Sequence, residues 1–107
     1  MATVSWSVLA EGFVPDTTPA DIFNAGADEV WVKLVTLFND DAAQQAVVLY
    51  VLRSGGTTRK VARYVLDQNE SASWDLEIAL GPGDSIQAVT TTASAVHYTV
   101  SGGTKVP

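Results

Sequence analysis

The sequence contains no cysteine and a single histidine. The missing cysteines exclude a disulfide framework, a thiolate metal site and a cysteine nucleophile. Long hydrophobic runs are also missing, because the longest, AVVLYVL at 46–52, is far shorter than the roughly 18–20 residues that a membrane-spanning helix requires. No basic segment followed by an apolar stretch and a cleavage site opens the chain. We therefore expect a protein that is made and kept in the cytoplasm unless it leaves inside a larger particle, without a signal peptide and without a membrane partner.

Basic residues are scarce as well. Six Lys and Arg stand against 12 Asp and Glu, for a net charge of −6. A surface field of this sign opposes polyanions, so the sequence predicts no nucleic-acid partner. Half of the basic residues lie together at Arg59, Lys60 and Arg63. On a strand, this cluster is typical of a solvated sheet edge.

Strand-forming residues dominate what is present. The 107 residues are 47% hydrophobic, which is enough for a single core. Polar turns separate about seven or eight short apolar runs, a pattern that favours an all-β, single-domain antiparallel β-sandwich with a jelly-roll-like form. Residues 1–107 are predicted to form this one domain. Within it, residues 1–28 would be an N-terminal strand and an irregular loop, extended only at Ile22–Phe23, that could serve as a docking segment.

Alternation of apolar and polar residues predicts which side chains face the core. The inward-facing residues are predicted to be Val4, Trp6, Val8, Trp74, Leu76, Ile78, Leu80, Ile86, Ala88, Val96, Tyr98 and Val100. His97 would then face outward, as a surface or interface residue. Trp31 shares its face with Lys33 and is the best candidate for an exposed aromatic side chain, which could stack on a sugar.

Two consecutive runs, 29–38 and 46–53, are apolar on both faces and are predicted to form a hairpin. On the first, Val30, Val32, Leu34, Thr36 and Phe38 would share one face. Such strands are either central and covered on both sides, or their outer face meets another subunit. Because a short chain has little left to cover a second face, the sequence favours oligomerisation. The predicted interface consists of Trp31, Val35, Leu37, Val47, Leu49 and Val51.

The stretch Gly81, Pro82, Gly83 and Asp84 is predicted to be a structural turn between two strands. Proline sets φ near −65°, and the flanking glycines can adopt positive φ, so the chain reverses direction sharply. The tetrapeptide SGGT occurs at 54–57 and again at 101–104, and both copies are predicted to be turns.

Candidate chemistry is sparse. A metal site at His97 would need carboxylates from distant turns, and no G-x-S-x-G nucleophile motif occurs. The acidic turn residues Asp40, Asp41, Asp67 and Glu70 lack the spacing of a calcium loop, and the glycine corners lack the Lys-Ser/Thr of a phosphate loop. The sequence therefore predicts no catalytic, cofactor-binding or metal-binding residues, and a protein that is not an enzyme.

The run LEIALGPGDSIQAVTTTASAVHYTVSG, 76–102, resembles the C-terminal half of small structural proteins encoded in tailed-bacteriophage virion gene clusters. The shared features are an L-x-x-GD-x-I-x-A turn and strand, a stretch of small residues and a last strand ending in SG. They fall at Leu80, Gly83, Asp84, Ile86, Ala88, Thr92, Ala93, Ser101 and Gly102. The segment 30–52 also resembles theirs, with Asn39 in the place of a family-like asparagine, whereas the first 26 residues do not match the start of the family.

The resemblance implies a β-sandwich or jelly roll that assembles on a phage particle and carries no catalytic residues. It implies a capsid decoration or stabilising protein, or a tail accessory, whose partners are its own copies in a homotrimer and phage capsid or tail subunits. Two alternatives stay open: a carbohydrate- or receptor-binding module of a phage tail or fibre, and a bacterial β-sandwich adhesion domain.

Overall fold

Eight β-strands make up the fold. The computed structural model describes residues 3–15, 17–56 and 58–106, and for residues 3, 4, 76 and 106 it describes the backbone alone. The strands are β1 (Thr3–Phe13), β2 (Ala20–Asn24), β3 (Val30–Asn39), β4 (Gln45–Leu52), β5 (Thr58–Leu66), β6 (Ser71–Leu80), β7 (Ser85–Thr90) and β8 (Val96–Val106). The described ranges contain no helix, and so none that is long and apolar enough to cross a membrane.

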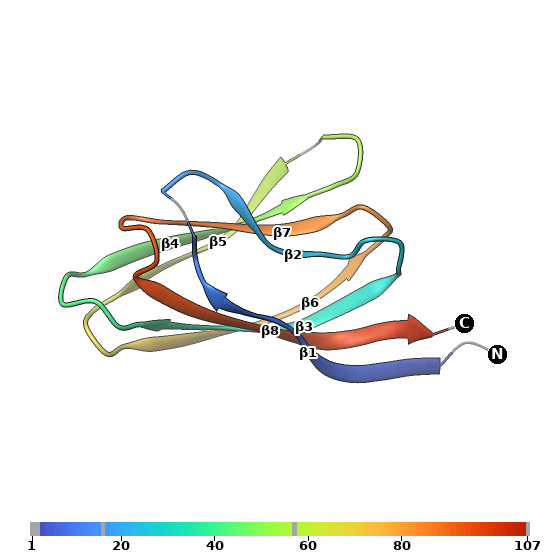
Figure 1. The fold of residues 1–107 in the computed structure, drawn as a ribbon, viewed down its shortest axis with the longest axis horizontal. Helices are drawn as coiled ribbons and strands as arrows, with labels where there is room; N and C mark the ends of the chain where they lie inside the picture. Colours follow the sequence, from blue (N-terminus) through green and yellow to red (C-terminus); the bar gives the residue numbers. More distant parts are fainter. Residues whose placement is uncertain (1–2, 16, 57, 107) are drawn as a thin grey trace.

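The strands form two antiparallel sheets that pack as a sandwich (Figure 1). The first sheet has the order β1-β8-β3-β6 and the second the order β2-β7-β4-β5. Every connection except β4–β5 crosses from one sheet to the other, which is the arrangement of a double-sheet jelly roll. The predicted fold class is confirmed. The hairpin predicted for 29–53 is wrong, because β3 and β4 lie in opposite sheets.

The core lies between the two sheets. It includes Val30, Val32, Val35 and Leu37 from β3, Val47, Leu49 and Val51 from β4, and Leu66, Leu80, Ile86, Ala88, Val96 and Val100 from other strands. Trp74, Ile78 and Tyr98 are partly buried and pack against this cluster, as the alternation predicts. The side chains of Val4 and Leu76, also predicted to face inward, lie outside the described residues.

Irregularities in the strand pairing cross the first sheet at one level. Leu9 on β1 and Lys33 on β3 are each an extra residue opposite β8, and β6 has two residues, 76 and 77, opposite Lys33. A bulge reverses which side chains face the core beyond it. Val32 and Val35 therefore both point inward. The single face predicted for Val30 through Phe38 is wrong beyond Lys33.

Two segments predicted as irregular are strands. Residues 20–24 form a short edge strand, because β7 supplies an antiparallel partner that the local sequence does not reveal. The second SGGT lies within β8, paired with β1 on one side and β3 on the other, whereas residues 54–56 of the first lie in the β4–β5 turn. The basic cluster at 59–63 lies on β5, an edge strand as predicted.

Candidate functional site: the outer face of the first sheet

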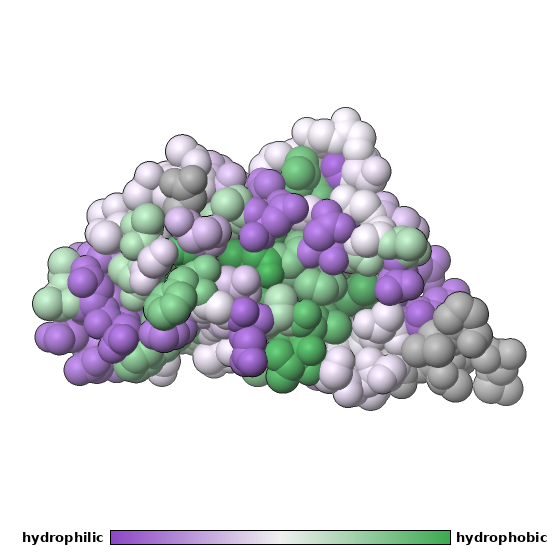
Figure 2. Space-filling view, viewed as in Figure 1, coloured by the Kyte–Doolittle hydropathy of each residue, from purple (hydrophilic) through white to green (hydrophobic). Residues whose placement is uncertain are grey.

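Exposed hydrophobic side chains gather on the outer face of the first sheet. Among the described residues, the large hydrophobic side chains with high exposed fractions are Trp6 at 63%, Val8 at 57%, Phe13 at 50%, Val65 at 42% and Trp31 at 37%. All but Val65 lie on this face, as the strand register shows. Figure 2 looks onto the side of the sandwich and shows hydrophobic residues in its middle, both where β1 and β8 run in Figure 1 and between the two sheets. A monomer seldom exposes apolar surface in this way unless something binds there.

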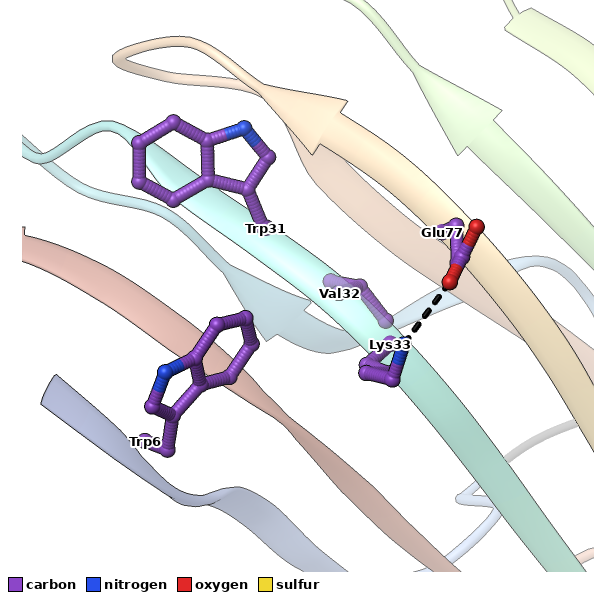
Figure 3. A pocket seen from close by; sticks show the side chains of 5 residues that line it. All are labelled: Trp6, Trp31, Val32, Lys33 and Glu77. Carbon is purple, nitrogen blue, oxygen red and sulfur yellow. Dashed lines mark hydrogen bonds and ion pairs between the residues drawn. The ribbon is translucent and has the colours of Figure 1, made fainter. Parts of the chain in front are cut away.

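One part of this face is a row of residues that we call the tryptophan row. Trp6 on β1 and Trp31 on β3 both pair with Gly103, which lies between them on β8. Two strand spacings separate the tryptophans, about 10 Å. Beside this row lies a hollow of about 260 Å³, lined by both indoles and by Val32, Lys33 and Glu77 (Figure 3).

Gly102 lets β3 and β8 approach closely beside this hollow. A Cβ atom at position 102 would collide with the carbonyl oxygen of Trp31 and lie only 3.0 Å from the Cα of Val32. Both contacts are to backbone atoms, so a change of rotamer cannot relieve them. Glycine is therefore required where the chain bulges at Lys33.

An ion pair forms another wall of the hollow. Lys33 Nζ donates a hydrogen bond of 2.7 Å to Glu77 Oε1 (Figure 3). The hydrogen bond and the opposite charges raise the pKa of Lys33 and lower the pKa of Glu77. Glu77 has a φ of 46°, a left-handed conformation that is uncommon for a residue other than glycine. The bulges on β3 and β6 thus bring these two charged groups together beside the tryptophans.

A second aromatic row crosses the same strands at their other end, and we call it the histidine row. Phe13 on β1 and Phe38 on β3 pair with His97 on β8. The ring centroids of His97 and Phe13 are 4.3 Å apart, and those of His97 and Phe38 are 6.1 Å apart. His97 Nε2 lies 3.5 Å from a carboxylate oxygen of Asp40. Trp6 and Phe13 are seven residues apart on β1, so the two rows are about 20 Å apart.

The corner Gly81–Asp84 supports the end of the sandwich nearer the tryptophan row. Asp84 Oδ1 accepts a hydrogen bond of 2.7 Å from the backbone N–H of Ser54, and Oδ2 accepts bonds from Arg53 Nη1 at 2.9 Å and the Gly81 N–H at 3.0 Å. These donors, first Ser54 and then Arg53, hold the pKa of Asp84 below its ordinary value. Arg53 also donates to the carbonyl of Ala79, the residue that pairs with Trp31 on β6.

Gly83 closes the corner. Its φ is +84°, and its N–H donates to the carbonyl of Gly26 in the β2–β3 loop. The carbonyl of Asp84 accepts a hydrogen bond from the N–H of Ala25 in that loop. The corner that joins β6 to β7 therefore also ties down two neighbouring turns.

Most of the predicted interface is in the core instead. Val35, Leu37, Val47, Leu49 and Val51 are each at most 3% exposed. They cannot meet another subunit in this fold, because β3 and β4 face each other across the sandwich and bury one another's apolar faces. Among the predicted interface residues, Trp31 alone is on the surface.

Two of the three tryptophans lie where the sequence predicts, and one does not. Trp31 is exposed and Trp74 packs against the core, both as predicted. Trp6 was predicted to be in the core, and that prediction is wrong. The apolar positions of the first strand mark the outer face of the sheet, since Trp6 pairs with Gly103 in the same row as Trp31. The signal in the sequence that points to this site is Trp31 on a face shared with Lys33, since both residues line the hollow.

Charged side chains elsewhere do not converge on a further site. Within the described part of the chain, no group of three or more His, Asp or Glu residues could hold a metal ion. His97 is surrounded by phenylalanine rings and one carboxylate rather than by a nucleophile.

Comparison with known proteins gives a likeness of fold. No family model and no curated protein matches the chain. It resembles a chain in the solved structure of infectious bursal disease virus, Gx strain, with a TM-score of 0.53 and 15% identity over 98% of this chain and 32% of that chain. The structure of the Gt strain gives a TM-score of 0.46 and 14% identity, over 97% of this chain and 32% of that chain. The protein thus spans about a third of these viral chains and shares the fold of the first.

Proposed function

We propose that the chain is a non-enzymatic structural protein of a virus particle, specifically a bacteriophage capsid decoration protein that forms a homotrimer and binds neighbouring shell subunits. The eight-stranded jelly roll supports this role, since the fold is common among viral capsid domains. The likeness to a chain of infectious bursal disease virus and the phage-like motifs around Gly83 and Asp84 agree with it.

The observation that carries the proposal is the apolar outer face of the first sheet. Its exposed side chains replace the buried β3 and β4 residues as the contact surface. The histidine row suits a contact between subunits, because His97 packs against both phenylalanines and the three rings form one aromatic surface. Phe13, half exposed on the edge strand β1, would be the centre of that contact.

A trimer would act mechanically. Each copy would contact one shell subunit, and the three contacts together would oppose separation of the shell subunits. Linked contacts raise the effective affinity without requiring a large interface in any one copy.

The test is the mass of the purified protein by light scattering across a dilution series. The wild-type protein should be a trimer at high concentration, and Phe13→Asp should shift the mass toward the monomer because it places a charge in the contact. Val65→Asp is the matched control, since Val65 is similarly exposed on the second sheet. A wild-type monomer at every concentration, or equal loss in both variants, would contradict the proposal.

A further inference from the structure

We propose that the hollow of the tryptophan row is a binding site for a sugar ring, a pyranose unit of a glycan. The inference goes beyond the virion role and does not rest on it. The hollow lies about 20 Å along β1 from the histidine row, so both surfaces can be occupied at once.

The apolar half of the site fits one flat ring. Trp6 and Trp31 come from the strands on either side of β8, about 10 Å apart in the strand register, and both indoles line the hollow (Figure 3). A pyranose presents a face of C–H groups that packs against an indole, whose large apolar ring keeps a polar N–H free for a hydroxyl. The hollow of about 260 Å³ is smaller than the sites of drug-sized ligands and suits a single ring.

The polar half favours a polyol over other flat ligands. Lys33 and Glu77 bond to each other, yet the ammonium keeps further donors and the carboxylate further acceptor positions. Neighbouring sugar hydroxyls can accept from Lys33 and donate to Glu77 together. A proline ring, the other common partner of a tryptophan slot, has no N–H and could not use the remaining acceptor positions of Glu77.

The site is held in place by its backbone. The bulge at Lys33, the left-handed conformation of Glu77 and the close contact of Gly102 with β3 set the backbone positions from which Lys33 and Glu77 pair beside the indoles. A site formed before the ligand arrives loses less entropy on binding.

Further hollows adjoin the site on both sides. Trp31 also lines a hollow of about 240 Å³ with Ala79 and Gly81, and Trp6 lines one of about 460 Å³ with Val8 and Ser101. Each tryptophan thus separates two hollows along one face. An oligosaccharide of several rings can follow this line, so we expect it to bind more tightly than a monosaccharide.

The test is a titration followed through the indole N–H signals of the three tryptophans by two-dimensional NMR. The probes are cellotetraose, maltotetraose and chitotetraose, each with its monosaccharide, and a proline decapeptide. At least one tetrasaccharide should shift the Trp6 and Trp31 signals saturably, with a Kd of about 1 mM or tighter, while Trp74 stays in place. Absence of saturable shifts with all three tetrasaccharides, or shifts by the peptide alone, would overturn the proposal.

Variants locate the binding. Trp6→Ala and Trp31→Ala should each weaken binding about tenfold or more, and Glu77→Gln about threefold or more. Phe13→Ala, in the histidine row, should bind like the wild-type protein. An unchanged Trp74 signal in each variant shows that the fold is intact, and Trp31→Phe, which keeps a ring, should recover part of the affinity. Full affinity in both tryptophan-to-alanine variants would overturn the proposal.

Discussion

Strands β1, β8 and β3 place a row of aromatic residues at each end of the first sheet, and the two rows differ in their middle residue. At one end β8 places Gly103 between two tryptophans, and at the other it places His97 between two phenylalanines. Hollows of similar volume border the two rows, about 260 Å³ at the tryptophan row and about 270 Å³ at the histidine row. They differ in their lining, because the first has two indoles and the Lys33–Glu77 ion pair, and the second has Phe13 and His97.

The buried polar groups beside the two rows also differ. Near the tryptophan row, Asp84 and Arg53 form a charged hydrogen-bonded group. Near the histidine row, the fully buried Asn39 is neutral: its Nδ2 donates to the carbonyls of Ala43, Leu66 and Asp67, and its Oδ1 accepts from the Asp41 N–H. The stabilisation by Asp84 should therefore be lost in acid, whereas a charged side chain at position 39 should destabilise the protein.

The largest loss of stability is expected at Asn39, the neutral buried residue near the histidine row. Asn39→Asp would replace a donor by a carboxylate facing three carbonyl oxygens, and should lower the free energy of unfolding by about 3 kcal/mol or more at pH 7. Because burial favours the protonated acid, part of the loss should return as the pH falls. Urea denaturation at two pH values measures both effects. Asn69→Asp, on an exposed turn, is the control, and an equal loss there would refute the assignment.

The second largest loss of stability is expected at Gly102, on β8 beside the tryptophan row. Gly102→Ala drives a Cβ atom into β3 and should cost about 3 kcal/mol. Gly12→Ala is the matched change near the histidine row, where the new Cβ would lie 3.5 Å from the Tyr98 hydroxyl, an ordinary contact. Thermal unfolding should separate the two variants clearly. Similar melting temperatures would show that the close approach of β3 and β8 is not a constraint.

Substitution of Asp84, in the charged corner, should lower stability less, and by an amount that depends on pH. Asp84→Asn loses an acceptor for one of three donors and should cost about 1–3 kcal/mol at neutral pH. Since the folded pKa of Asp84 is lowered, its stabilisation is present above the ordinary value of 3.8 and disappears as the pH falls through the folded pKa. The difference between wild type and variant should therefore shrink in acid. A constant difference, or the same behaviour in the exposed control Asp28→Asn, would contradict this.

The smallest effect comes from giving one row the middle residue of the other. His97→Gly removes the ring between Phe13 and Phe38 and should lower stability by about 1–2 kcal/mol. His97→Phe keeps a ring there and should stay within about 0.5 kcal/mol of the wild type. Chemical denaturation compares them, and a phenylalanine variant as unstable as the glycine variant would argue against ring contacts.

The sequence predicts the fold class because strand alternation and turn residues are local signals. It does not predict the outer face, for a physical reason. The irregularities at Leu9 and Lys33 appear only once the strands pair, and beyond each of them the other set of alternate positions points inward. Trp6 precedes the bulge at Leu9 and was placed in the core for another reason: alternation shows that Trp6 and Val8 share a face, but not that this face is the outer one. Alternation also could not show that β3 and β4 face each other, which moved Val35 and Val47 from a predicted interface into the core.

Hydroxyl-radical footprinting across a concentration series tests most directly whether the outer face of the first sheet is the contact surface. Our account predicts that Phe13 and Phe38 become protected as the protein associates, while Trp6 and Trp31 stay reactive until a bound oligosaccharide covers them. Tyr50 and Val65, on the second sheet, should react equally at all concentrations. Protection of Tyr50 and Val65 with none at Phe13 would contradict the account and place the contact on the opposite sheet.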